Sequence, residues 1–378
     1  MVEQVTSPVD LASELVADIR ANAETAEADR RVPDHIIRAM AERGLFRLCV
    51  PSAYGGSEVD PLTLVRVLET IAIGDGSTGW VAMIGATTGA LGFYLPEEGA
   101  AEVYSSDPEV LTGGVFAPRG VAHPDEGGFR VTGRWGFASG CEHATWLIGG
   151  SLVDGLPPPR QMVFRASEVR VLDTWRVSGL RGTGSHDMAV EDVFVPESRQ
   201  ASIVSEPPRL RTPLSAFPVF GLLAVGIAAV CLGIARAAVD ELIGLASVKK
   251  PEGSGRLLYE RPGTQAAVGA AEGELRAARA FLEEALSEVW EAATQAGEIS
   301  VRDRALVRLA ATHATHSAAS TVDLMYSAGG GTSIYETSPL QRHFRDIHTA
   351  TQHMMVAPPT LELTGRVLLG LDTDTSQL

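Results

Sequence analysis

Cysteines, clustered basic residues and the common nucleotide-binding motifs are scarce or missing in this chain of 378 residues. The three cysteines, Cys49, Cys141 and Cys231, are far apart and form no CxxC pair, so no disulfide framework is expected and a reducing, cytoplasmic location is predicted. No basic run occurs and the formal net charge is -16, which argues against a nucleic-acid partner because phosphate backbones are bound through clustered Lys and Arg. The GxGxxG and P-loop motifs are absent, so any nucleotide must be bound in another way.

A signal peptide is not expected either, because the N-terminus is acidic and has no basic segment followed by an apolar run. One uncharged stretch, residues 216–235, is long enough to span a bilayer. It consists largely of Ala, Gly and Val, has Pro218 near its start, and continues with Arg236 and Asp240 at helical spacing. We therefore expect a buried helix and no association with a membrane.

The pattern of apolar residues divides the chain into three parts. Residues 1–109 are predicted to form an N-terminal helical domain, in which Leu11, Leu15 and Ile19 recur at helical spacing. Residues 110–212 contain short runs rich in Val and Phe between turn clusters, which predict a central antiparallel β-barrel or sandwich. Long helical patterns return over residues 213–378 and predict a C-terminal helical bundle. The fold class expected from this order is α+β.

Motifs in all three parts support a more specific interpretation. They are DGSTGW at 75–80, GRWGFASG at 133–140, SGLRGTGSHD at 178–187, EDVFVP at 191–196 and a glycine triplet at 329–331 ahead of Arg345 and Asp346. Over nearly the whole chain this set resembles the acyl-CoA dehydrogenase superfamily, and the resemblance implies that fold.

One change from the dehydrogenase pattern is decisive. In those enzymes a glutamate eight residues after the Arg-Asp pair removes a proton from the substrate, and here that position is Met354, preceded by His353. The second place used for this glutamate aligns with Leu223. A thioether or an isobutyl group cannot accept a proton, whereas an imidazole has an ordinary pKa of about 6.5. The resemblance therefore implies a flavin-binding scaffold with other chemistry.

Within the superfamily, the segments 75–80 and 137–140 look more like the reduced-flavin-dependent monooxygenases. The resemblance implies the oxygenase component of a two-component system, which takes FMNH2 or FADH2 from a separate flavin reductase. It would then hydroxylate an aromatic or heteroaromatic small molecule with molecular oxygen through a flavin C4a-hydroperoxide. The Arg-x-x-Phe-Gly segment that grips FAD in the dehydrogenases is absent, its nearest match lying at 261–265, so FMN and FAD both remain open.

The same resemblance assigns the site residues. Ser139 is expected at flavin N5, and His353 at the reacting edge of the ring, where it would hydrogen-bond the hydroperoxide or accept a substrate proton. The cofactor-binding set is Phe116, Ala117, Phe137, Ala138, Ser139, Gly330 and Gly331, the last two approaching the flavin of a neighbour in a homotetramer. The substrate cavity is expected to be lined by Trp80, Leu223 and Met354.

Several plainer interpretations stay open at this point. Ser139 is alternatively a strand-end serine that caps local backbone, and His353 a buried helical histidine bonded to a carbonyl. His313 and His316 are spaced as metal ligands can be, but no carboxylate completes the set, so no metal is expected. The alternative functions are an acyl-CoA dehydrogenase-type oxidoreductase with an atypical base and a non-catalytic member that keeps the fold for assembly.

Overall fold

The N-terminal part consists of helices whose ends follow from local sequence. The computed structural model describes residues 6–154 and 156–378. Helix α1 begins after Ser7, whose hydroxyl accepts the backbone N–H of Asp10. Asp75 ends α3 and caps α4 by accepting the N–H of Thr78, so the two helices meet at a sharp corner. The helices are α1 (Pro8–Asp29), α2 (Asp34–Glu42), α3 (Pro61–Gly74), α4 (Gly76–Thr88) and α5 (Glu97–Tyr104).

The central part is a seven-stranded sheet with the order β5-β6-β2-β1-β3-β4-β7. An antiparallel barrel or sandwich was expected, but β1 and β3 run parallel, with Thr112 opposite Trp146. The other pairings are antiparallel, so the sheet is mixed. Its strands are β1 (Thr112–Asp125), β2 (Gly128–Trp135), β3 (Trp146–Val153), β4 (Leu156–Arg165), β5 (Arg170–Leu172), β6 (Asp187–Pro196) and β7 (Gln200–Ala201).

The C-terminal part is a bundle of long helices, as predicted. Helix α7 contains most of the uncharged stretch at 216–235 and is buried almost throughout that stretch, packed against α3 and α9. Although long and apolar enough to cross a membrane, it is therefore a core helix. The helices are α6 (Pro213–Ala216), α7 (Val219–Val248), α8 (Pro262–Ala296), α9 (Val301–Gly329), α10 (Pro339–Ala350) and α11 (Pro359–Leu368).

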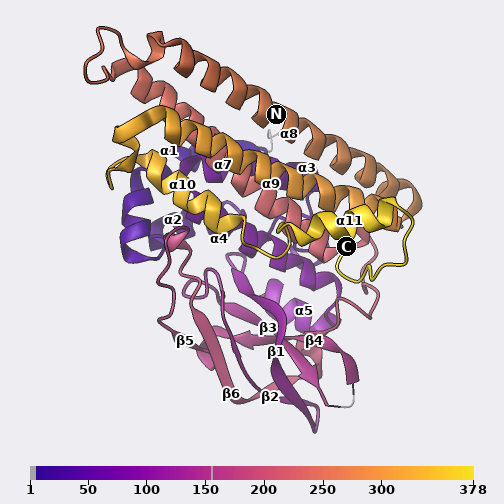
Figure 1. The fold of residues 1–378 in the computed structure, drawn as a ribbon. Helices are drawn as coiled ribbons and strands as arrows, with labels where there is room; N and C mark the ends of the chain where they lie inside the picture. Colours follow the sequence, from indigo (N-terminus) through magenta and orange to yellow (C-terminus); the bar gives the residue numbers. More distant parts are fainter. Residues whose placement is uncertain (1–5, 155) are drawn as a thin grey trace, which may run out of the picture.

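The long helices lie together as a bundle in the upper part of the picture, and the sheet lies below them (Figure 1). Helix α4 lies where the two meet, in contact with α7 on one side and with β1 on the other. The changes between helix and strand fall between Tyr104 and Thr112 and between Ala201 and Pro213. We keep the division into domains at 109/110 and 212/213 as a proposal.

Candidate functional site

A chain of hydrogen-bonded hydroxyl groups lies at the junction of helices and sheet. The indole Nε1 of Trp80, on α4, donates to the Oγ of Ser139 at 3.1 Å. The Oγ atoms of Ser139 and Ser185 are 2.7 Å apart, and the Ser185 Oγ is 2.7 Å from the Oγ1 of Thr183. Thr183 in turn donates to the carbonyl of Leu180 at 2.8 Å. All three hydroxyl residues are buried.

The direction of the protons in this chain follows from its two ends. A carbonyl only accepts, so Thr183 uses its one proton on Leu180, and Ser185 must donate to Thr183. Ser139 must then donate to Ser185, because the Ser185 proton is already in use. Since an indole N–H only donates, Ser139 also accepts from Trp80. Ser139 is left with one lone pair and no free proton, so it meets any further partner as an acceptor.

The far end of the hydroxyl chain is anchored by a buried acid pair. The N–H of Leu180, a residue with a left-handed backbone (φ 51°), donates to Oδ1 of Asp346 at 2.6 Å. Burial, together with the neighbouring Asp75, raises the pKa of Asp346 to about 7, against the opposing effect of the Leu180 hydrogen bond and Arg342. Burial also raises the pKa of Asp75. The Asp346 carboxyl therefore changes its protonation near neutral pH.

The segment that carries Ser139 is fixed against the loop before β6. The N–H of Ala138 donates to the carbonyl of His186 at 3.0 Å, and the N–H of Gly140 to the carbonyl of Thr183 at 2.9 Å. Phe137 adopts a left-handed backbone (φ 67°) and leaves its ring 76% exposed. The side chain is large, apolar and exposed to solvent, and its backbone is in a strained conformation. Both features are typical of ligand sites. Phe137 therefore presents an open aromatic face next to Ser139.

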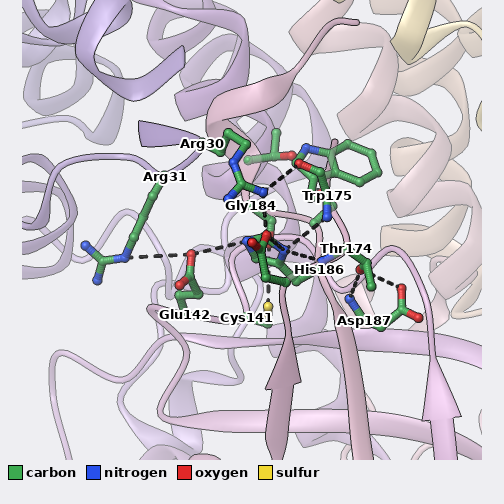
Figure 2. Close-up of polar contacts among 12 residues, drawn as sticks. Arg30, Arg31, Cys141, Glu142, Thr174, Trp175, Gly184, His186 and Asp187 are labelled. Atoms are coloured by element: carbon green, nitrogen blue, oxygen red, sulfur yellow. Dashed lines mark hydrogen bonds and ion pairs between the residues drawn. The ribbon is translucent and has the colours of Figure 1, made fainter. Parts of the chain in front are cut away.

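His186 holds the neighbouring loop in place (Figure 2). Its Nδ1 accepts the backbone N–H groups of Thr174 and Trp175 at 3.2 and 3.1 Å. The ring proton is thus on Nε2, which faces Glu142 at 3.6 Å. Arg30, at the end of α1, bonds the carbonyl of Trp175 at 3.1 Å. The result of these contacts is a fixed Trp175, held by His186 and Arg30.

Trp175 completes an aromatic corner beside the hydroxyl chain. Its ring meets that of Phe137 edge-on, with 6.0 Å between centroids. Its Nε1 donates to the carbonyl of Leu180 at 3.0 Å, the same carbonyl that receives the Thr183 proton. The aromatic corner and the hydroxyl chain therefore share one anchor point.

His353 lies on the helical side of the same junction, in the turn between α10 and α11. Its ring centroid is 5.8 Å from that of Trp80. Burial, with a smaller effect of Arg308, lowers the pKa of His353 to about 4, so the imidazole is neutral at pH 7. Its Nδ1 accepts the N–H of Met355 at 3.2 Å, which leaves the proton on Nε2. In this state His353 offers a hydrogen-bond donor to the site, and of the two roles expected for it the donor role fits better than that of a base.

The three residues expected to line the substrate cavity differ in their surroundings. Trp80 and Leu223 are buried, and Trp80 lies between Ser139 and His353. Met354 is 58% exposed, in the turn after α10. Trp80, Ser139 and His353 are thus brought together, while Met354 lies at the rim.

The expected cofactor residues fall into two groups. Phe116 and Ala117 lie in β1, between Val115 and Gly120, where its pairing with β3 shifts register. Gly330 and Gly331 follow the C-terminal end of α9 and are exposed. At 1.5 Å per residue they are about 30 Å along α9 from Arg308, which lies near His353. Within one chain the two glycines therefore do not join the site of Ser139 and His353.

His313 and His316 each contact another part of the chain. The His313 ring packs on Phe281, with 5.8 Å between centroids, and Nε2 of His316 is 3.1 Å from the carbonyl of Val356. Among residues 6–154 and 156–378 no group of three or more His, Cys, Asp or Glu side chains is placed to hold a metal ion.

Comparison with known proteins gives the family. The sequence family described as acyl-CoA dehydrogenase, N-terminal domain, matches residues 9–103, and the one described as acyl-CoA dehydrogenase, C-terminal domain, matches residues 225–358. An indole-3-acetate monooxygenase of Pseudomonas putida is 36% identical over 94% of this chain and 92% of its own length. The chain belongs to the flavin-dependent monooxygenases of the acyl-CoA dehydrogenase fold. Both the fold and the enzyme class inferred from the sequence are confirmed.

Two further monooxygenases are similar over most of their length. The flavin-dependent monooxygenase, oxygenase subunit HsaA, of Rhodococcus jostii is 30% identical over 90% of this chain and 92% of its own. The structure of XiaF from a Streptomyces species in complex with FADH2 and glycerol superimposes with a TM-score of 0.90 at 28% identity, covering 97% of this chain and 96% of the other. These relatives are an oxygenase subunit and a protein that binds reduced flavin.

Four residues near Ser139 or His353 were not singled out from the sequence. Thr183 and Ser185 lay within the motif at 178–187, but their pairing with Ser139 depends on tertiary contacts across 46 positions. Trp175 had no local signal. Arg308 did have one, because it shares a helical face with Ala305 and Thr312, both buried. A charged residue on a buried face is an indication of function that the sequence contained.

Proposed function

We propose that this monooxygenase is the oxygenase component of a two-component system and hydroxylates an aromatic or heteroaromatic small molecule with reduced flavin supplied by a separate reductase. The observation that carries the proposal is the proton direction at Ser139. Reduced flavin has an N–H at N5, whereas oxidised flavin has only an acceptor there. A Ser139 that can only accept is matched to the reduced ring and mismatched to the oxidised one.

The residues around Ser139 fit a flavin ring. Phe137 leaves its aromatic face open, Trp175 closes the corner behind it, and burial of Ser139 and Trp80 keeps water from N5. When bound, reduced flavin supplies the activation of molecular oxygen. Ser139 would hold the N5 proton in place, since loss of that proton favours release of hydrogen peroxide. FMN and FAD are both retained as candidates.

His353 would act from the opposite side as a donor. Its Nε2 proton is available because Nδ1 already accepts from Met355. The lowered pKa of His353 keeps the ring neutral at pH 7, so it can hydrogen-bond a developing negative charge on oxygen without adding a full charge to a dry site. No carboxylate takes the place of a dehydrogenase base, as Leu223 and Met354 occupy both positions used for it. We therefore do not propose acyl-CoA dehydrogenation.

The aromatic substrate is supported by the lining and by the relatives. Trp80 and Leu223 give an apolar wall, and Met354 is an exposed apolar residue at its rim. The relative from Pseudomonas putida is named for indole-3-acetate, and a relative from a Rhizobium species, 30% identical over 94% of this chain, is a resorcinol hydroxylase oxygenase component. Both names denote planar aromatic substrates.

Assembly and location complete the proposal. We place Gly330 and Gly331 against the flavin of a neighbouring copy in a homotetramer, since neither can reach the site in its own chain. The burial of α7 in the core is compatible with a cytoplasmic enzyme.

The test is to mix the protein anaerobically with reduced FMN or FADH2 and an aromatic substrate, and then to add oxygen. We expect hydroxylated product in amounts close to the reduced flavin supplied, with little hydrogen peroxide. Release of all the flavin electrons as hydrogen peroxide with every aromatic compound tried, or reduction of bound oxidised flavin by an acyl-CoA, would contradict the proposal.

A further inference from the structure

Arg308 is a buried cation that has no charged partner in the part of the chain that the structure describes. It lies on α9, and only 2% of the residue is exposed. One guanidinium nitrogen donates to the carbonyl of Phe220 at 3.2 Å, and Nε is buried with no hydrogen-bond partner. Burial alone lowers the pKa of Arg308 to about 10, with no contribution from any carboxylate in the described part of the chain. At neutral pH it is nevertheless charged.

Two other buried arginines, Arg47 and Arg199, have more partners than Arg308, although the Nε of Arg199 also lacks a hydrogen-bond partner among the described residues. Arg47 donates to three backbone carbonyls, those of Tyr54, Gly55 and Asp107. Arg199 lies within ion-pair distance of two glutamates and over the ring of Trp146. Placing a charge in a low-dielectric interior costs several kcal/mol unless it is paired and hydrogen-bonded. Among the described residues Arg308 has one backbone carbonyl and no charged partner to offset this cost, which is the pattern expected of a group whose partner is a ligand.

The position of Arg308 points to the substrate side of the site. It bonds the carbonyl of Phe220, which lies one helical turn before Leu223 on α7. It is also close enough to His353 to help lower the pKa of that residue. Phe220 is only half-buried, and its hydrogen bond with Arg308 is partly accessible to solvent. The guanidinium therefore lies between the start of α7 and the turn that carries His353, behind the proposed substrate wall.

We propose that Arg308 binds the carboxylate of an aromatic acid and so makes this enzyme selective for anionic substrates. This inference rests on the proposed function where it takes the pocket beside Arg308 to be the substrate pocket. Binding of a carboxylate by Arg308 does not depend on it. A guanidinium presents parallel N–H groups that match the two oxygens of a carboxylate. A single guanidinium beside a neutral imidazole suits one negative charge, whereas a phosphate group would require further donors.

The test is equilibrium binding under anaerobic conditions in the presence of reduced FMN. Indole-3-acetate and the uncharged indole-3-acetamide, which have nearly the same shape, are titrated calorimetrically into the wild type and three variants. We expect the wild type to bind the acid at least tenfold more tightly than the amide. In Arg308→Met this preference should disappear through weaker binding of the acid, while the amide is held within threefold.

Two further variants separate charge from geometry. Arg308→Lys keeps the charge but loses the two parallel N–H donors of the guanidinium, so an intermediate preference for the acid over the amide is expected. Arg302→Gln removes one charge from an exposed position in the first turn of the same helix and should leave both affinities unchanged. The unliganded Arg308→Met protein should unfold at a higher temperature than the wild type, because an unpaired buried charge has been replaced by an apolar chain.

Several results would overturn the inference. They are equal affinity of the wild type for acid and amide, no binding of the acid, or an unchanged preference in Arg308→Met. Weaker binding of reduced FMN with unchanged acid affinity in that variant would instead assign Arg308 to the flavin phosphate. Because oxygen is excluded, these outcomes are independent of whether the enzyme hydroxylates its ligand, so a failure here is distinguishable from a failure of the proposed function.

Discussion

The two sides of the site differ in how completely their polar groups are satisfied. On the sheet side, Ser139, Ser185 and Thr183 form an unbroken chain in which every proton has an acceptor. On the helical side, His353 accepts through Nδ1 and so has its proton on Nε2, and Arg308 has a buried Nε with no partner among the described residues. The hydroxyl chain is complete before any ligand arrives, whereas the donors of His353 and Arg308 are not.

This difference separates two tasks. A satisfied network fixes the direction of its protons in advance, so it can discriminate between two redox states of the same ring without moving. Unsatisfied donors in a dry pocket instead gain their partner only on binding, and they discriminate between ligands by charge. We therefore assign recognition of the cofactor state to the sheet side and recognition of the substrate to the helical side.

The largest effect is expected from removing Ser139. Ser139→Ala deprives N5–H of its acceptor and leaves the indole N–H of Trp80 buried without a partner. Loss of one preorganised hydrogen-bonding group commonly costs 10²–10³ in rate, so the ratio of hydroxylated product to hydrogen peroxide should fall at least about tenfold. Ser139→Thr keeps the hydroxyl and serves as the control. An unchanged ratio in the alanine variant would mean that the sheet side does not act on the flavin.

The next effect concerns His353 as a donor. His353→Ala should lower the rate of hydroxylation about tenfold, and His353→Gln, which keeps an N–H, should retain a larger share. Because the pKa of His353 is about 4, its ring gains a proton only below about pH 5, and the rate should show no rise attributable to it between pH 6 and 8. A pH–rate profile that rises through pH 6.5 in the wild type and is flat in the glutamine variant would show that His353 is a base after all.

A smaller effect is expected one position along the hydroxyl chain. Ser185→Ala frees the proton of Ser139, which can then donate to the N5 acceptor of oxidised flavin. The preference for reduced over oxidised FMN, measured as the ratio of dissociation constants, should fall about three- to tenfold, the value of one neutral hydrogen bond. Thr183→Ser, which preserves the hydroxyl, is the matched control. If the ratio is the same in the alanine variant, Ser185 does not set the proton direction.

Asp346, at the far end of the hydroxyl chain, is expected to have the smallest effect on the reaction but a clear effect on the free energy of unfolding. The raised pKa of Asp346, about 7 against an unfolded value of about 3.9, means that the folded state holds an extra proton between these pH values. The free energy of unfolding should therefore decrease as pH rises from about 4 to about 7, by at most about 1.4 kcal/mol per pH unit. Asp346→Asn keeps an acceptor for the N–H of Leu180 and should flatten this dependence in urea unfolding. An equally steep dependence in the variant would assign it to other groups.

The fold was largely predictable because its signals are local. Helical spacing such as that of Leu11, Leu15 and Ile19 and the uncharged run at 216–235 each describe one element. The parallel pairing of β1 with β3 was not predictable, since it depends on contacts between strands that are separated by β2.

The site also has a part that could be predicted from the sequence and a part that could not. Ser139, Trp80 and His353 could be named because motifs identify them, and the structure brings them together. The donor state of His353 depends on the N–H of Met355 and on burial, neither of which a sequence records. The sequence places the charge of Arg308 on a buried helical face, but only the structure shows which of its N–H groups have partners.

Helix α7 has a consequence for how this protein is made in a cell. Its apolar surface is covered by α3, which precedes it, and by α9 and α10, which follow it. During translation α7 therefore leaves the ribosome before α9 and α10 have been made. Its apolar surface stays exposed and prone to aggregation until Ala350 has been added. Chaperones that shield nascent chains should engage this segment, and fragments that end before α9 should aggregate when they are expressed.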